Sequence, residues 1–186
     1  MKRPGLHEMT YIGVFAALMT ALGYVEIPLP FSPVPITGQT FGVMLAGSLL
    51  GSRLGFLALA VFDLIGLVFP VFAGGSGGPG VLAGPTGGYI LSWPLAAWVI
   101  GRLTEQVPRP SFFRIFAANV LGGILVVYAL GVTQLALVTH LGLVPAIIKG
   151  ALPFIPGDLI KCAVAALASQ RLAVLLPFRK DKQNFA

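Results

Sequence analysis

A chain of 186 residues in which 56% of the side chains are hydrophobic and only 10% are charged is unlike a soluble domain, where about a quarter are charged. The composition predicts an integral membrane protein, and the length suits a single membrane domain over residues 1–186 rather than two domains. The net charge of +6 comes from basic residues scattered singly between apolar runs, so no nucleic-acid surface is predicted.

The apolar runs predict an all-α protein with a bundle of six transmembrane helices. A hydrocarbon core of about 30 Å needs about 20 helical residues, and prolines, glycines and short polar turns separate the runs. The predicted helices cover residues 9–26, 38–51, 54–69, 86–103, 112–139 and 156–176.

The first predicted helix carries a stripe of small residues. Gly13, Ala17 and Ala21 recur every four positions and therefore share one face. Small residues let a second helix approach closely, which is the usual basis of helix association in lipid. The stripe can pack within this chain's own bundle or receive a helix of another protein.

The proline-rich loop P-L-P-F-S-P-V-P-I-T-G-Q-T leads into the second predicted helix and places polar residues at its mouth. Thr37 can cap the helix by accepting from its free N–H groups. Gln39 can both donate and accept hydrogen bonds, and it lies where a ligand could be recognised.

Asp63 is an acidic residue near the middle of the third predicted helix. A charge inside the bilayer is costly and needs compensation. Three interpretations stand side by side: a functional group, a structural partner of an arginine or lysine on another helix, or a protonated, hydrogen-bonded acid.

The next segment, residues 70–89, contains eight glycines. It lacks the G-x-x-x-x-G-K-[ST] pattern of a phosphate-binding loop. Because glycine permits unusual backbone angles, the segment is interpreted as a mobile external lid over a cavity, between the third and fourth helices. Tyr89, at its end, can stack on a ligand or anchor the chain at the membrane interface.

Several other polar residues suit structural roles. Asn119, Tyr128 and Gln134 in the fifth predicted helix are expected to hydrogen-bond neighbouring helices. Residues 141–152 are predicted to form a short surface helix or loop. The two histidines lack metal-binding spacing, so no metal site is predicted. The single cysteine, Cys162, cannot form an internal disulfide.

Asp158 and Lys161 stand in the stretch P-F-I-P-G-D-L-I-K, at the head of the last predicted helix. A charge at the bilayer centre costs about 2.5–3.5 kcal/mol on insertion scales. The two residues lie one helical turn apart on the same face. They therefore need each other, a water-filled cavity or a ligand.

The distribution of basic residues predicts the orientation. If the N-terminus is cytoplasmic and the chain crosses six times, ten of the twelve Lys and Arg residues lie inside, as the positive-inside rule prefers. Both termini are then cytoplasmic. The proline-rich loop, the glycine-rich segment and the Asp158 element converge on the external face, where a ligand site is expected.

Three motifs in this order, P-V-P-I-T-G-Q-T, then P-V-F-A-G-G-S-G-G with G-P-T-G-G-Y, then P-F-I-P-G-D-L-I-K, resemble the BioY family. These proteins are the biotin-binding S components of energy-coupling-factor (ECF) transporters. The resemblance covers about residues 9–176. It implies a multi-pass protein of the cytoplasmic membrane that captures external biotin, with a transmembrane T component and two ATP-binding-cassette ATPases as partners. It implies no enzymatic activity and no cofactor beside the transported biotin.

The resemblance also implies roles for individual residues. Asp158 would accept hydrogen bonds from the ureido N–H groups of biotin. Lys161 would donate to the ureido carbonyl or the carboxylate, or hold Asp158 in place. The remaining implied ligand-binding residues are Gln39, Tyr89, Thr37, Gly74 and Gly75, and the A-x-x-x-A pattern of Ala17 and Ala21 implies the docking surface for the T component.

The sequence is also compatible with three other functions. The chain could be an S component for another small vitamin, because the scaffold is shared and the pocket decides. It could be a solitary biotin carrier that works without ATPases. An intramembrane enzyme using Asp63 or Asp158 as an acid or base is opposed by the lack of a nucleophile beside a histidine and by Lys161 as a charge partner.

Overall fold

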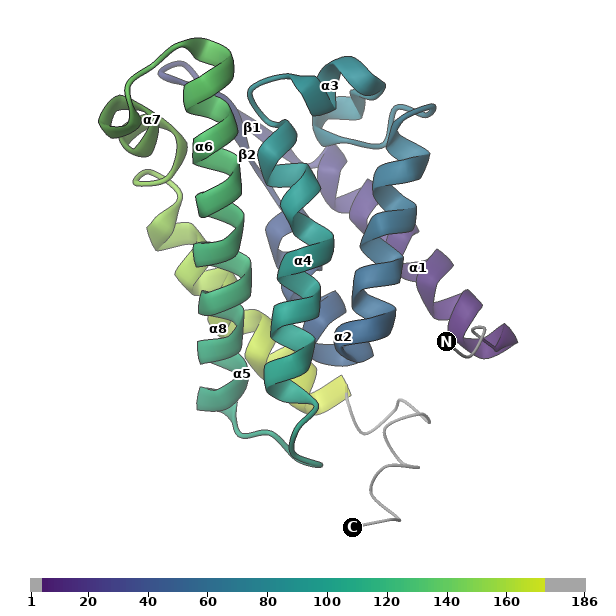
Figure 1. Cartoon of the computed structure of the whole chain (residues 1–186). Coiled ribbons are helices and arrows are strands. Elements are labelled where there is room, and N and C mark those ends of the chain that lie inside the picture. The colour runs from purple at the N-terminus through teal and green to yellow at the C-terminus, as the bar shows by residue number, and fades with distance from the viewer. Residues whose placement is uncertain (1–4, 173–186) are drawn as a thin grey trace.

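The structure is a computed structural model, and it describes residues 5–172. Its long helices run side by side and form one bundle, with a small β-hairpin and short helices gathered at one end (Figure 1). In chain order the elements are α1 (Leu6–Tyr24), β1 (Glu26–Leu29), β2 (Ser32–Thr37), α2 (Gln39–Gly66), η1 (Ala73–Gly75), α3 (Pro79–Ala83), α4 (Gly87–Thr104), α5 (Phe112–Asn119), η2 (Val120–Val126), α6 (Val127–Thr139), α7 (Leu143–Gly150) and α8 (Ile155–Leu172).

Helix α2 is folded back on itself at Gly51. Gly51 has φ 81° and ψ −178°, backbone angles that glycine adopts without steric cost. A methyl group on Gly55 would lie 3.1 Å from the backbone oxygen of Ala46, whereas nine residues of straight helix would separate the two by about 13 Å. The arms on either side of Gly51 therefore lie against each other, and the break predicted between the second and third helices lies at this residue.

Glycines bring α2 and α4 into close contact. A methyl group on Gly47 would lie 2.8 Å from the backbone oxygen of Ala97, and one on Gly101 would overlap the backbone of Gly51 and Ser52. Such close approach needs small residues. Glu105, just after α4, accepts hydrogen bonds from Ser52 N at 3.0 Å and Ser52 Oγ at 2.8 Å, so it holds the start of the second arm.

The helix predicted over residues 112–139 consists of α5, η2 and α6, which follow one another without a break. Its middle part, η2, is a π-helix. Asn119, just before η2, accepts from Ser48 Oγ at 3.0 Å and donates to the backbone oxygen of Cys162 at 3.2 Å. These bonds join it to α2 and α8, as expected for a polar residue between membrane helices.

The proline-rich loop differs from the prediction. It forms an antiparallel hairpin in which Glu26 pairs with Thr37 and Ile27 with Ile36, and the register shifts between Ile27 and Leu29. The all-α prediction is therefore wrong for this segment, and the first helix ends at Tyr24 rather than at residue 26. A two-stranded ribbon consists only of edge strands, where proline is tolerated.

Within residues 5–172, three helices are long and apolar enough to cross a membrane: α1, α2 and the run Phe112–Thr139. Helices α7 and α8, bent by 53°, give a fourth if they count as one span. The last predicted helix extends to residue 176, and its end lies outside the described residues, as do Lys2, Arg3, Arg179, Lys180 and Lys182, which support the predicted orientation.

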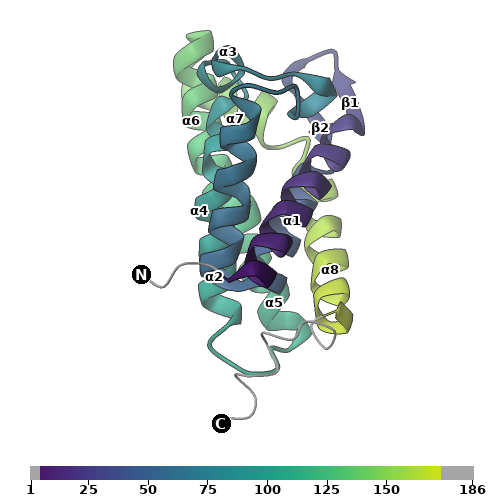
Figure 2. The ribbon, with the colours of Figure 1, turned by 90° about the vertical axis from the view of Figure 1, so that its right-hand side faces the viewer.

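Helix α1 runs obliquely beside α2 on the outside of the bundle (Figure 2). Its buried side chains are Ile12, Phe15, Ala16, Met19 and Gly23. The small-residue stripe of Gly13, Ala17 and Ala21 is exposed. The helices in the described part of the chain therefore do not cover this stripe.

Candidate ligand-binding site

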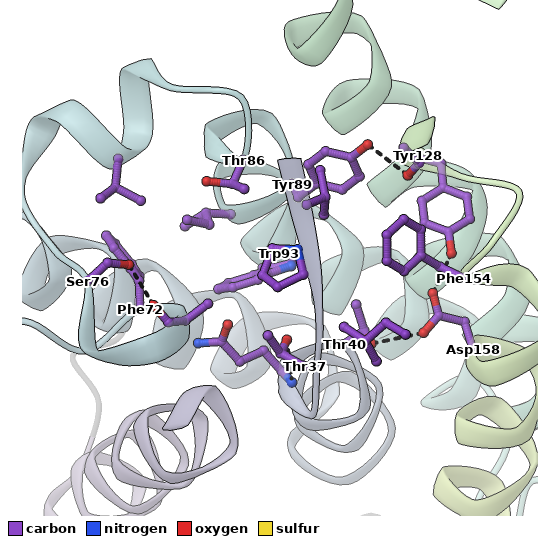
Figure 3. Close-up of a pocket in the computed structure, with 18 of the residues that line it drawn as sticks. Thr37, Thr40, Phe72, Ser76, Thr86, Tyr89, Trp93, Tyr128, Phe154 and Asp158 are labelled. Atoms are coloured by element: carbon purple, nitrogen blue, oxygen red, sulfur yellow. Dashed lines mark hydrogen bonds between the residues drawn. The ribbon is translucent and has the colours of Figure 1, made fainter. Parts of the chain in front are cut away.

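A cavity of about 610 Å³, measured to its open mouth, lies at the end of the bundle that carries the hairpin. Its walls come from β2, the start of α2, the glycine-rich segment, α4, α6 and the α7–α8 region (Figure 3). The apolar part of the wall includes Val34, Ile36, Phe72, Val81, Ile90 and Phe154.

Asp158 lies in the first turn of α8 and is only 2% exposed. Its Oδ1 accepts from Lys161 Nζ at 2.8 Å and from Thr40 Oγ1 at 3.2 Å. Its Oδ2 accepts from the hydroxyl of Tyr128. Side chains from α2, α6 and α8 thus hold one carboxylate in the cavity wall.

Lys161 has all three of its N–H donors engaged within the protein. Besides Asp158, the ammonium donates to the backbone oxygen of Thr37 at 2.9 Å and to Thr40 Oγ1 at 2.9 Å. A lysine has three donors and no acceptor. Of the roles that the sequence leaves open for Lys161, this geometry favours holding Asp158, together with the end of β2.

Gln39 and Thr37 both line the cavity, as the sequence predicts. Gln39 is 1% exposed, and its Nε2 donates to the backbone oxygen of Met19 on α1 at 3.4 Å. Thr37 Oγ1 accepts from the backbone N–H of Gln39 at 3.3 Å, the helix-start contact expected of it. Gln39 therefore joins the cavity wall to α1.

Tyr89 opens α4 and lines the cavity, but it is only 7% exposed. Its hydroxyl donates to the backbone oxygen of Gly150 at 2.8 Å, and its ring meets that of Tyr128 edge to face with centroids 6.5 Å apart. A buried ring of this kind cannot be an anchor at the membrane interface. Tyr89 instead links α4 to α7 through Gly150 and to α6 through Tyr128.

The glycine-rich segment covers one side of the cavity with short helices rather than with an open loop. Phe72, Ser76 and Val81 contribute to the wall. Gly74 and Gly75, with φ 62° and 73°, are not part of it: a methyl group on Gly74 would meet the carboxylate of Glu26, and one on Gly75 the ring of Tyr24. The two backbones thus lie beside the cavity wall rather than in it, and their contact with ligand stays a prediction.

The segment is fastened to the helices on either side. Gln134 on α6 donates from Nε2 to the backbone oxygens of Leu82 at 2.7 Å and Gly84 at 3.0 Å. The Tyr24 hydroxyl at the end of α1 donates to the backbone oxygen of Pro70 at 3.3 Å. These are the contacts that a lid would break on opening.

Tyr128, Thr40 and Trp93 are cavity residues to which the sequence prediction assigned no ligand role. Tyr128 does make the interhelical hydrogen bond expected of it, but its partner is Asp158 in the cavity wall. Thr40 was visible only as a polar residue at a helix mouth. Trp93 stands in an apolar run of α4, where sequence carries no signal that separates a cavity wall from a core.

Asp63 is 7% exposed and is not among the residues that line the cavity. Its Oδ1 has no hydrogen-bond partner, and it forms no ion pair within residues 5–172. The proposed pairing with an arginine or lysine is thus not seen in the described chain. Over the same range, no three His, Cys, Asp or Glu side chains are grouped closely enough to hold a metal ion.

Comparison with known proteins gives a consistent result. The model of the BioY family matches residues 1–178. A protein of Rhizobium etli named "Biotin transporter BioY" is 43% identical over 92% of this chain and 97% of its own length. Its namesake in Rhodobacter capsulatus is 45% identical over 91% of this chain and 95% of its own length.

Among solved structures, the S-component for biotin from an ECF-type ABC transporter superposes with a TM-score of 0.84. It is 32% identical in sequence, and the match covers 90% of both chains. Together with the apolar helices, these likenesses identify a multi-pass membrane protein with the fold of an ECF S component.

Proposed function

The chain belongs to the BioY family, and we propose that it is the substrate-binding component for biotin uptake across the cytoplasmic membrane. It captures biotin in the cavity beside Asp158 and releases it on the other side. The chain carries out transport and is not an enzyme. No covalent step is required of its residues.

The observation that carries this proposal is the buried Asp158 carboxylate, held by Lys161, Thr40 and Tyr128 in a largely apolar cavity. The ureido ring of biotin offers two N–H donors, which match a carboxylate acceptor. The thiophane ring and acyl chain match the apolar wall. The fixed carboxylate costs little to organise on binding, because its partners already hold it.

The chain would cross the membrane six times, with α1, the two arms of α2, α4, the run from α5 to α6, and α8 as the crossings. The break at Gly51 supports the count, because the two arms lie against each other. Both termini would be cytoplasmic. The cavity, the hairpin and the glycine-rich segment would then face the outside.

Energy would come from partner subunits, since the sequence contains no nucleotide-binding motif. The partners are a transmembrane T component and two ATP-binding-cassette ATPases. The exposed stripe of Gly13, Ala17 and Ala21 on α1 supports docking of the T component, because small residues permit close helix contact in lipid. A solitary carrier with the same cavity is the alternative.

The decisive experiment is equilibrium binding to the purified chain. Wild type is expected to bind biotin, and thiamine and riboflavin are expected not to compete. Asp158→Asn keeps the side-chain shape but removes the charge that strengthens the hydrogen bonds, so it should weaken biotin binding strongly. Tight binding of another vitamin with none of biotin would reject the proposal.

A further inference from the structure

Trp93 on α4 has a polar atom that none of the interactions above uses. The residue is 4% exposed, and its indole Nε1 has no hydrogen-bond partner. It is part of the cavity wall, and Figure 3 shows it between Phe72 on one side and Tyr128 with Asp158 on the other. A buried N–H without an acceptor is destabilising, so this position favours a bound acceptor.

The side-chain nitrogens of the cavity wall differ in whether the protein supplies an acceptor for their N–H groups. The described wall contains three, on Gln39, Trp93 and Lys161. Lys161 has all its donors engaged, and the Gln39 amide reaches the backbone oxygen of Met19. Trp93 Nε1 is the one of these three for which the described chain supplies no acceptor.

We propose that Trp93 Nε1 donates a hydrogen bond to the carboxylate of bound biotin. The inference rests on the proposed function and adds the group that recognises the second polar end of the ligand. With the ureido ring at Asp158, an acyl chain directed toward α4 would bring its carboxylate to Trp93, which lines the same cavity. The ligand's carboxylate needs a donor elsewhere in the cavity, because the ammonium of Lys161 and the hydroxyls of Thr40 and Tyr128 already donate within the protein.

The surroundings of Trp93 are apolar, so an anionic group that binds there depends on the indole N–H as a hydrogen-bond donor. Phe62 packs on the indole with ring centroids 5.9 Å apart. Phe62 also meets Phe72 edge to face, with ring centroids 5.6 Å apart. A carboxylate that enters so apolar a region loses water and needs a donor. The indole N–H is donor only, so the contact selects an acceptor.

The test compares two ligands on two proteins. Trp93→Phe keeps an aromatic ring and removes the N–H. Biotin is expected to bind this variant about tenfold to hundredfold more weakly than wild type, the loss typical of a hydrogen bond to a charged group. An analogue with a pentyl chain in place of the valerate should bind both proteins equally.

The other outcomes are also decisive. If Trp93→Phe binds biotin like wild type, or loses both ligands equally, Trp93 does not recognise the carboxylate. If the penalty instead disappears with desthiobiotin, which lacks the ring sulfur, the donor contacts sulfur and the carboxylate assignment is wrong. Failure of wild type to bind biotin at all would reject the proposed function and not this contact alone.

A second measurement leaves Trp93 intact. The chain has two tryptophans, and Trp98 is 44% exposed and lies outside the cavity wall. In Trp98→Phe the emission comes from Trp93 alone, and biotin affinity should equal that of wild type. Saturating biotin should change this emission more than the pentyl analogue does. Equal responses to the two ligands would overturn the proposal even if Trp93→Phe fails to fold.

Discussion

Lys161 Nζ lies 2.8 Å from Asp158 Oδ1, one helical turn away on α8. Because the same ammonium also holds the backbone of Thr37 and the hydroxyl of Thr40, it ties α8 to the hairpin and to α2. Its position fixes the carboxylate rather than presenting a free cation to a ligand. Substitutions can therefore distinguish the stabilising role of Lys161 from the role of Asp158 in binding biotin.

Lys161→Met should destabilise the protein, because it leaves the carboxylate of Asp158 buried without its cation. The loss in free energy of unfolding should be below the roughly 3–5 kcal/mol of a fully buried pair, since the Lys161 side chain is 22% exposed. Adding Asp158→Asn should restore much of the stability, measured by thermal unfolding, but not biotin binding. A double variant that binds biotin like wild type would contradict the role of Asp158.

Tyr128→Phe should weaken biotin binding, because it removes the hydroxyl that holds Asp158 Oδ2. The expected loss is about 1.5–3 kcal/mol at most, the range for a hydrogen bond to a charged group. Tyr89→Phe is the matched variant, since its hydroxyl contacts the backbone of Gly150 instead, and it should lose less. Equal affinities for the two variants in titration calorimetry would argue against a special role of Tyr128.

Gln134→Leu should release the glycine-rich segment, because both hydrogen bonds from α6 to Leu82 and Gly84 disappear. Biotin dissociation is expected to accelerate, and hydrogen exchange in residues 79–84 should rise. Thr133→Ala on the same helix is the control, since its hydroxyl bonds only to its own helix at Ala129. Unchanged exchange in Gln134→Leu would show that the segment is held by other contacts.

Gly101→Ala should lower thermal stability, because the added methyl group would overlap the backbone at Gly51 and Ser52. Overpacking of this kind typically costs about 1–3 kcal/mol. Gly13→Ala is the matched control: it lies in the exposed stripe of α1 with nothing within 4 Å of the added methyl, and alanine is the better helix former. If both variants unfold at the wild-type temperature, the contact between α4 and the turn of α2 is looser than described.

The sequence was most informative where charge or periodicity left few choices. Asp158 and Lys161 were visible because two charges in an apolar helix demand an explanation, and the run 112–139 was visible from its length. The hairpin was missed because four prolines in residues 28–35 read as a loop. Pairing of Glu26 with Thr37 across the turn is a tertiary feature that no local pattern reports.

The composition of the cavity wall was only partly predictable for a related reason. Tyr128 and Trp93 lie on α6 and α4, and only helix packing turns them toward Asp158 or Phe72 (Figure 3). The resemblance to the BioY family implies ligand contacts for the backbones of Gly74 and Gly75. In the structure these two glycines lie outside the cavity wall and pass close to Glu26 and Tyr24, two neighbours that the sequence does not predict.

Ala17→Trp should prevent docking of the T component without impairing biotin binding. Ala17 is exposed on the outer face of α1, and a large side chain there would block the close approach that small residues permit. Helix α1 contributes no residue to the cavity wall described above, so the purified variant should bind biotin normally. Co-purification with a tagged T component should fall sharply.

Leu125→Trp is the control, because Leu125 is 56% exposed on another helix and should leave the complex intact. Full recovery of the complex with Ala17→Trp would move the docking surface elsewhere, and loss with both variants would point to a general effect of bulk on the membrane-facing surface.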